Sequence, residues 1–580
     1  MLSMRIAAVM AGTLLACGLG ACGFLPVNVS TNDVDPLAVA SQALPEPAAS
    51  AQASFRVRAV RHAGPCDGES PVVDDPKRQK DALVLMALSG GGSRAALFSA
   101  QVMLEMQKMQ LGIDGKASNL LHEVDAISSV SGGSLPAAYY AISHDPHQPC
   151  AGMSRRVWDE PTVTELMTNN YLGRWFGNLF WPGNVLQFWL TAFDRTDIMA
   201  QTLSDNLYDK VPGGVDLTMA QLNPLRPNLI LNATVGSRSD DARLPFGSIF
   251  TFTAEDFGRI ASSIDSYSVG RAVMATATFP GAFNFMTLCD YAWKKSEYRS
   301  RSCRDRDDPR YLHLFDGGNA DNLGLTSLKR VIWSTLDKGE QPHLPRSKLV
   351  VLVVDSFIDS RGASPQVANP RGALDYLIDT NFIDATDVLL ESNRRRLIHE
   401  FDRGNLFPFG AGTGTGTGAE AGGDGSSSSV ASDAECRSLL APFGDEEKDH
   451  YCAKPASWWQ AVNRDIQSRL VFRHLSFGAV GELQAEPQPA AERVKDSLFL
   501  RNQLLGIPTS FKLRSQVDAQ TGLDDAGAIL CATPHLFGRA DDVPACAGIK
   551  PAMPRMAGTW DQVRCALQTP GQPCGLVPPR

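Results

Sequence analysis

A serine at a predicted strand-to-helix turn is the first candidate for chemistry in this sequence. Ser131 directly follows the predicted strand 124–130, and a helix is predicted from Leu135 onward. Ser129 and Gly133 stand two residues before it and two after it. Small residues are required at these positions because backbone segments approach closely at such an elbow, which exposes the hydroxyl. Ser131 is therefore a candidate nucleophile, although a Ser/Gly turn after a strand is also a common structural feature.

A run of three glycines supplies a candidate anion-binding loop. They are Gly90, Gly91 and Gly92, placed between a predicted strand and a predicted helix. Backbone N–H groups that enter a helix can point at one place, and the helix N-terminus adds partial positive charge. This arrangement suits a phosphate or the oxyanion of an acyl-transfer intermediate. The Gly-Lys-Ser/Thr ending of a phosphate-binding loop is missing here, which favours the oxyanion, with a plain tight turn as the alternative.

A carboxylate after another predicted strand could act as a base. Asp316 follows the segment 311–315 and precedes Gly317 and Gly318. A carboxylate in such a place can take a proton from a hydroxyl group within hydrogen-bond reach. An Asp-Gly-Gly sequence is by itself more often a turn, so this motif gains weight from the two motifs before it.

Predicted strands and helices alternate around these motifs. Continuous apolar runs such as 349–354 are typical of strands buried on both faces of a parallel sheet. Strands separated by helical stretches indicate an α/β layer architecture with a largely parallel sheet. The predicted strands are 82–88, 124–130, 228–235, 311–315 and 349–354, and the predicted helices include 95–109 and 135–142.

The order of the motifs resembles the patatin-like phospholipase family. The serine lies about 40 residues after the glycine run, and Asp-Gly-Gly follows about 185 residues later. Residues 232–234 (Asn-Ala-Thr) look like a strand motif of that family. Residues 275–283 look like its alanine-rich helix, which closes on a Pro-Gly turn. The resemblance covers about residues 83–354, with weaker similarity to about residue 530, and Ser129 departs from the family's usual glycine.

The resemblance implies a three-layer α/β/α fold and a Ser–Asp dyad. Ser131 would be the nucleophile and Asp316 the base in hydrolysis of a phospholipid or other lipid ester through an acyl-enzyme. The oxyanion hole would be formed by Gly90, Gly91 and Gly92, and neither a metal nor a cofactor is implied. The supporting residues are Arg94, which would brace the glycine loop, and Gly133, Gly317 and Gly318.

Other functions are compatible with the same residues. A thioesterase, a general esterase or an acyltransferase could use the same dyad. A catalytically inactive, membrane-tethered lipid-binding protein could keep the acyl pocket. A Ser-His-Asp triad would need a base such as His399 or His474, and neither histidine has a distinctive sequence context.

The first residues resemble a bacterial lipoprotein signal. Arg5 precedes an apolar run of about 14 residues, which is too short to span a membrane and fits a secretory signal. The run ends in residues 19–22 (Leu-Gly-Ala-Cys), which resemble a lipobox; Cys17 and an ordinary cleaved signal are the alternatives. We therefore expect an exported protein that is lipid-anchored through Cys22 in the bacterial cell envelope, with the outer membrane favoured over the inner membrane.

Composition divides the chain after the signal into three expected segments, whose bounds are given at the end of this paragraph. Residues 24–55 are rich in Pro, Ala and Ser without Lys or Arg, which predicts a flexible tether. A Gly/Thr/Ser-rich stretch at 410–432 predicts a solvated insertion. The expected segments after the signal at 1–21 are a tether and N-terminal extension at 22–80, a catalytic domain at 81–530 and a cysteine-containing tail at 531–580.

Cysteine content and charge limit the environment and the partners. Ten of the 12 cysteines remain without Cys17 and Cys22, an even number that suits disulfides. The absence of Cys-x-x-Cys spacing leaves a zinc site without support. The net charge of −9 excludes a chain-wide basic surface for nucleic acid, and the oligomeric state is left open. The simplest pairs, which sequence alone leaves open, are Cys289/Cys303, Cys436/Cys452, Cys531/Cys546 and Cys565/Cys574.

One segment is unusually aromatic. Residues 171–193 hold 8 aromatic side chains in 23 residues, against 8% aromatic residues in the whole chain. Two interpretations stay open, which are a buried cap over the sheet and a lid or lipid-facing surface near the acyl pocket, since Trp and Tyr favour membrane interfaces. The charged run 304–308 alternates Arg with Asp. This alternation predicts a solvated loop and argues against a calcium site.

Overall fold

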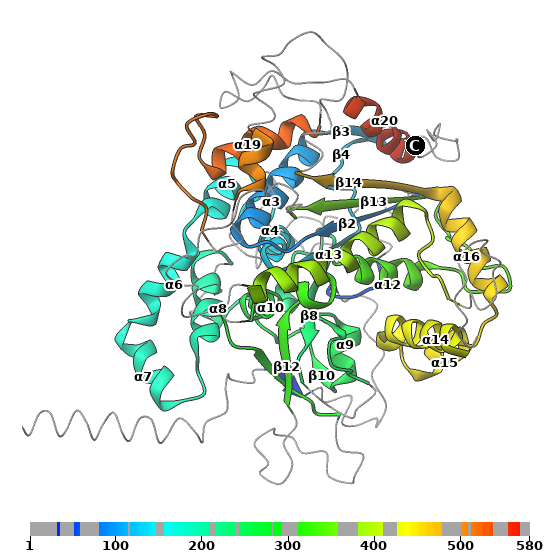
Figure 1. Ribbon diagram of the computed structural model, residues 1–580, viewed down its shortest axis with the longest axis horizontal. Coiled ribbons are helices and arrows are strands. Elements are labelled where there is room, and N and C mark those ends of the chain that lie inside the picture. Colours follow the sequence, from blue (N-terminus) through cyan, green and yellow to red (C-terminus); the bar gives the residue numbers. More distant parts are fainter. Residues whose placement is uncertain are drawn as a thin grey trace, which may run out of the picture.

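The fold was obtained as a computed structural model (Figure 1). The predicted signal, Cys17, Cys22, the charged run 304–308 and residues 410–425 lie outside the described residues. No helix within the described part of the chain is long and apolar enough to cross a membrane. The structure describes residues 32–34, 52–58, 81–113, 116–146, 156–208, 210–211, 215–237, 243–280, 282–292, 311–357, 381–409, 426–477, 500–507, 512–537 and 555–568.

A sheet of eight strands forms the centre of the molecule, in the order β11-β12-β8-β5-β2-β13-β14 with β9 paired to β8. Neighbouring strands from β8 to β14 run parallel, whereas β12, β11 and β9 are antiparallel to their neighbours. The bounds are β2 (Ala82–Leu88), β5 (Ala126–Val130), β8 (Asn228–Val235), β9 (Ile249–Thr251), β11 (Met286–Cys289), β12 (Tyr311–Asp316), β13 (Lys348–Asp355) and β14 (Leu470–Ser476).

The apolar runs became strands because they are covered on both faces. All seven residues of β2 are buried, and alternate residues belong to two different hydrophobic cores. Val84 and Met86 join the core with α3 (Gly92–Lys108), α4 (Ser134–Ile142) and α19 (Asp525–His535). Leu83 and Leu85 join the core with α12 (Leu325–Thr335) and α16 (Ala456–Arg469). The predicted three-layer α/β/α fold with a mainly parallel sheet is thereby confirmed (Figure 1).

The other elements lie around these layers. The remaining helices are α5 (Glu160–Thr168), α6 (Tyr171–Leu179), α7 (Pro182–Leu190), α8 (Arg195–Asn206), α9 (Ala254–Arg259), α10 (Val269–Thr276), α11 (Gly318–Asp321), α13 (Asn381–Asp402), α14 (Ser426–Leu440), α15 (Asp445–Cys452) and α20 (Arg555–Gln568). The small sheets pair β1 (Asp33–Val34) with β10 (Ser262–Ser263), β3 (Gln110–Ile113) with β4 (Lys116–Asn119), and β6 (Lys210–Val211) with β7 (Val215–Asp216).

The prediction of a flexible tether over 24–55 is wrong where this segment is described. Strand β1 pairs with β10, and Phe55 is completely buried in the core beside α12. The Ser54 hydroxyl donates a hydrogen bond of 2.6 Å to Glu255 Oε1. One buried aromatic ring and a satisfied polar partner are enough to order a segment whose overall composition is typical of a linker.

The expected boundary at residue 531 is also wrong. Helix α19 runs through it, and Cys531 is fully buried against the core that contains α3. The ring of Trp560, on α20, stacks on Phe537 with 4.5 Å between centroids. The described part of the C-terminal segment is therefore a piece of the main core. Helix α14 likewise begins at Ser426, inside the stretch predicted as a solvated insertion.

One predicted disulfide is confirmed. Cys436 and Cys452 are bonded and join α14 to α15, with 5.7 Å between their Cα atoms. Cys289, Cys531 and Cys565 are disulfide-bonded as well. Cys303, Cys546 and Cys574, the partners predicted for them, lie outside the described residues.

Candidate active site

Ser131 occupies a strained turn between β5 and α4. A single turn of 3-10 helix (Ser131–Gly133) connects the two elements, and Ser131 has a φ of 48°. A positive φ is uncommon for a residue with a side chain and is found where the surroundings enforce it, often at functional sites. The predicted elbow is therefore present, and the serine side chain is 7% exposed.

Close backbone contact explains the small residues of the elbow. A Cβ atom on Gly132 would overlap the backbone of Gly92, and one on Gly133 would lie 2.6 Å from the Ser89 carbonyl oxygen. The elbow and the glycine loop thus pack directly on each other. Ser129, which replaces the usual glycine, is fully buried, and its carbonyl accepts a hydrogen bond of 2.8 Å from Asn232 Nδ2.

Asp316 lies at the end of β12, and the Ser131 side chain is among the groups that act on its pKa. The carboxyl is 5% exposed, and the Gly318 N–H donates a hydrogen bond of 2.8 Å to its Oδ1. Burial raises the pKa of Asp316 to about 6, against the opposing effect of the hydrogen bonds from Gly318 and Ser131. At neutral pH the carboxylate is ionised and is a stronger proton acceptor than an exposed aspartate.

Strand β8 lies between the serine and the aspartate and sets their separation. Its Asn232 pairs with Val130 of β5, and its Ala233 pairs with Asp316 of β12. A Cβ atom on Gly317 would overlap the Asn232 carbonyl oxygen, so only glycine fits where the chain leaves β12. The Asp-Gly-Gly motif is thus both a turn and the end of an active-site strand.

The glycine loop presents two backbone donors beside Ser131. The Gly90 N–H is already engaged with the Asn322 carbonyl oxygen at 3.0 Å. Among the described residues, none accepts a hydrogen bond from the N–H of Gly91 or Gly92. A Cβ atom on Gly90 would lie 3.2 Å from the Ser131 Cβ atom, which places the loop against the elbow. Gly91 and Gly92 therefore remain as candidate oxyanion donors, because the Gly90 N–H already has an acceptor. Gly90 instead allows the loop to approach Ser131 closely, since it has no side chain.

Arg94 is enclosed by protein. The side chain is 4% exposed, and its Nη1 donates a hydrogen bond of 2.5 Å to the Ile507 carbonyl oxygen. This contact ties the first turn of α3 to a segment more than 400 residues away. The predicted role of Arg94 in bracing the glycine loop stays a prediction.

Comparison with protein families adds to this geometry. Residues 86–329, which include Ser131, Asp316 and the whole glycine loop, match the patatin-like phospholipase family. This part of the chain is a patatin-like phospholipase domain. The family match supports a lipid acyl hydrolase. No match is found among curated protein sequences.

Solved structures with some similarity to the chain were found as well. Human GIVD cytosolic phospholipase A2 is 14% identical, and the alignment covers 47% of this chain and 42% of that one, with a TM-score of 0.28. The chain thus matches less than half of the human protein. VipD from Legionella pneumophila is 11% identical over 88% of this chain and 87% of that chain, with a TM-score of 0.21.

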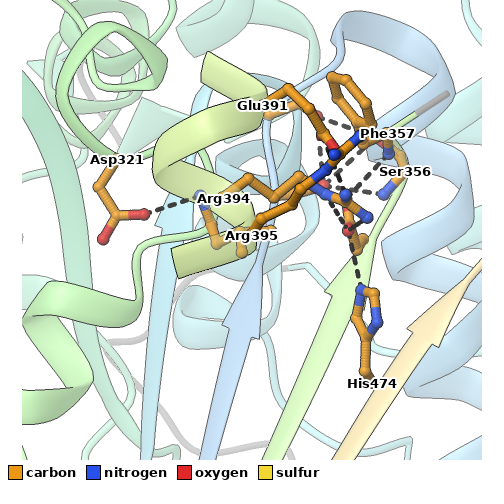
Figure 2. Close-up of polar contacts among 11 residues, drawn as sticks. Asp321, Ser356, Phe357, Glu391, Arg394, Arg395 and His474 are labelled. Atoms are coloured by element: carbon orange, nitrogen blue, oxygen red, sulfur yellow. Dashed lines mark hydrogen bonds and ion pairs between the residues drawn. The ribbon is translucent and has the colours of Figure 1, made fainter. Parts of the chain in front are cut away.

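A second carboxylate lies behind the glycine loop of the patatin-like domain (Figure 2). Asp355, at the end of β13, is fully buried and accepts hydrogen bonds from His474 Nε2 at 2.8 Å and Arg394 Nε at 2.7 Å. Burial acts to raise the pKa of Asp355, but the His474 hydrogen bond and the Arg394 charge outweigh it and hold the pKa well below its usual range. The adjacent Ser356 hydroxyl donates a hydrogen bond of 2.9 Å to the Gly90 carbonyl oxygen, which connects this cluster to the loop.

These contacts do not support the triad alternative. His474 is hydrogen-bonded to Asp355 and lies on β14, three strands from β5. His399 lies on α13, and neither histidine contacts Ser131 among the described contacts. The described residues also contain no cluster of three or more His, Cys, Asp or Glu side chains able to hold a metal ion.

The sequence motifs did not predict that Asn322, Asp355 and Ser356 lie at the candidate site. Asp355 and Ser356 directly follow the strongest predicted strand. Polar residues just beyond the carboxyl ends of parallel strands are frequent at sites, so this position was the available signal. Asn322 has no comparable signal, because its role depends on the approach of the glycine loop.

Asp316→Asn is predicted to raise stability at alkaline pH while abolishing ester hydrolysis. The pKa of Asp316 is raised in the folded protein, so its contribution to stability is present below about pH 4 and lost as the pH rises through about 6. Removing the charge should therefore raise the free energy of unfolding by about 3 kcal/mol near pH 8 and leave it nearly unchanged near pH 4. Urea denaturation at the two pH values measures this difference, and wild-type turnover should rise with pH through about 6.

Asp197→Asn is the matched control. Asp197 is a second fully buried carboxyl whose pKa burial raises, but it has the guanidinium of Arg271 at 2.5 Å. Its replacement leaves that cation without its partner and should lower stability at pH 8. Equal effects of the two substitutions would contradict the prediction for Asp316.

Gly132→Ala is predicted to destabilise the site through backbone contact alone. The added methyl group would overlap the Gly92 backbone and push the glycine loop from the elbow, at a cost of about 1–3 kcal/mol. Turnover should fall by about a hundredfold or more because the backbone donors move. Gly112→Ala is the control, since a methyl group there meets nothing within 4 Å. Thermal unfolding and ester turnover, measured on both variants, test this prediction. A Gly132→Ala protein as active as Gly112→Ala would contradict it.

Proposed function

We propose that this protein hydrolyses carboxylic ester bonds of lipids through a Ser131–Asp316 dyad, with phospholipid or lysophospholipid as the substrate class. The observation that carries the proposal is the placement of Ser131 and Asp316 at the ends of two strands that both pair with β8, where burial raises the pKa of Asp316 to about 6. A serine is a weak nucleophile unless an adjacent base takes its proton. Asp316 is the group with that position and that basicity.

The reaction proceeds in two stages on these residues. Asp316 accepts the Ser131 proton as the serine oxygen attacks the ester carbonyl, and the N–H groups of Gly91 and Gly92 stabilise the oxyanion. Collapse of the intermediate releases the alcohol, which takes the proton from Asp316, and leaves the acyl group on Ser131. Water then attacks the acyl-enzyme and gives a proton to Asp316. When this second intermediate collapses, the Ser131 oxygen takes that proton back from Asp316 and the fatty acid is released.

The buried surroundings of Asp316 suit this role. The carboxyl accepts a backbone hydrogen bond from Gly318, which holds it in place, and no cation among the described residues is a cause that lowers its pKa. Asp355 is the opposite case, because Arg394 and His474 keep it ionised and weakly basic. The family match over residues 86–329 supports the lipid ester as substrate.

Labelling with an active-site fluorophosphonate tests the dyad. Wild-type protein should be labelled at Ser131, and Ser131→Ala should lose both labelling and lipid ester hydrolysis by about a thousandfold or more. Ser134→Ala is the matched control, because Ser134 lies three residues away and bonds Thr276 instead of Asp316. Equal labelling of wild type and Ser131→Ala would overturn the dyad.

Lipid profiling separates the alternatives. Labelling of Ser131 with turnover of thioesters or soluble esters, but of no lipid ester, would replace the proposed activity with a thioesterase, a general esterase or an acyltransferase. Lipid binding without labelling or turnover would identify an inactive lipid-binding protein.

We also propose that the protein is exported and anchored in the bacterial outer membrane by acylation of Cys22. The support is the lipobox-like sequence at 19–22, after an apolar run that is too short to span a membrane. Mass spectrometry of the mature N-terminus should find an acylated Cys22, and Cys22→Ala should abolish acylation. An unacylated mature protein that begins elsewhere would overturn the anchor.

A further inference from the structure

The aromatic segment 171–193 forms a helical hairpin of α6 and α7 that projects from the body beside α8 (Figure 1). The interpretation of this segment as a buried cap is wrong, because Tyr171 is the only buried residue of the two helices. Seven of the ten large apolar side chains that are exposed among the described residues belong to it. The most exposed are Leu190 at 70%, Trp181 at 67% and Phe180 at 64%.

Polar contacts hold the hairpin in this orientation. Asn178 Nδ2, on α6, donates a hydrogen bond of 2.9 Å to Thr202 Oγ1 on α8. Asn184 Nδ2, on α7, donates one of 2.9 Å to the Asn178 carbonyl oxygen. Trp175 Nε1 donates one of 2.9 Å to the Arg195 carbonyl oxygen. The inner side of the hairpin is therefore fastened by hydrogen bonds, and its large apolar side chains are left in contact with solvent.

The hairpin is connected to the candidate active site through one segment. The ring of Trp175 packs edge-on against Phe283, with 5.5 Å between centroids. Phe283 follows Thr278, whose carbonyl oxygen accepts a hydrogen bond of 3.2 Å from the Asp316 N–H. Two residues five positions apart, Thr278 and Phe283, thus contact the proposed base and the hairpin respectively.

The charge of the hairpin indicates what it contacts. The whole chain has a net charge of −9, yet residues 171–193 contain no carboxylate and a single cation, Arg174. A surface that bears phosphate groups repels carboxylates and tolerates such a segment. Exposed apolar patches mark interaction sites, and Trp and Phe side chains insert at the boundary between lipid head groups and acyl chains.

We propose that the aromatic hairpin inserts into the head-group region of a phospholipid bilayer and holds the active site at the membrane surface. The inference rests on the proposed lipid hydrolase function for its purpose, although the insertion itself is measured without catalysis. Because the contact is apolar, binding should be insensitive to salt, unlike the binding of a basic patch.

Fluorescence quenching by brominated phosphatidylcholine tests the insertion. The full chain is mixed with vesicles of this lipid while carrying Ser131→Ala, so that no lipid is hydrolysed, and Cys22→Ala, so that no acyl anchor holds it on the vesicles. Bromine should quench tryptophan fluorescence equally at low salt and at about 0.5 M salt. Adding Phe180→Ser and Leu186→Ser keeps every tryptophan and should weaken vesicle binding by about tenfold or more. Phe246→Ser is the control, because Phe246 is 60% exposed outside the hairpin.

Three results would overturn the proposal. They are an absence of quenching, equal quenching with and without the hairpin substitutions, and a dimer that the substitutions convert to a monomer without any change in quenching. With the active serine present, the ratio of turnover on vesicles to turnover on a monomeric ester should fall about tenfold in the hairpin variant. Quenching without turnover on either substrate would leave the insertion standing and remove the proposed hydrolase function.

Discussion

The close packing of the glycine loop on the turn that contains Ser131 is the contact on which the rest of the site depends. The backbone of Gly92 occupies the space that a side chain at residue 132 would need, and Ser89 does the same at residue 133. Because the glycine loop and the turn at residues 132 and 133 both lack side chains, their backbones approach closely. This approach brings Ser131, the proposed nucleophile, close to the backbone N–H groups of Gly91 and Gly92. This contact also explains why β5 must lie beside β2, since each strand ends in one half of the site.

Two buried carboxylates at strand ends show how different surroundings shift the pKa of an aspartate in opposite directions. Asp316 is surrounded by uncharged groups, and burial raises its pKa to about 6. Asp355 is equally enclosed but has Arg394 and His474 as partners, so its pKa falls. A carboxylate that accepts hydrogen bonds from an arginine and a histidine is a poor base but a stable anchor. The adjacent Ser356 donates a hydrogen bond to the Gly90 carbonyl oxygen.

Much of the fold could be predicted from local pattern, and the failures have one cause in common. The apolar runs predicted strands, including β13, because fully covered parallel strands are continuously hydrophobic. Composition predicted a tether at Phe55 and left the exposure of the 171–193 hairpin undecided. Both depend on partners that are distant in sequence, which are the β2–α12 core for Phe55 and the polar groups of α8 for the hairpin.

The sequence by itself determined the types of residue at the site, their order and the small neighbours of Ser131, since these requirements are local. It did not determine that β12 runs antiparallel to β8, which lets Asp316 meet Ser131 across a strand. Nor did it determine that the N–H of Gly90 is engaged while those of Gly91 and Gly92 have no acceptor among the described residues. Strand direction, burial and hydrogen-bond partners arise from contacts between residues far apart in the chain, so only the tertiary structure decided them.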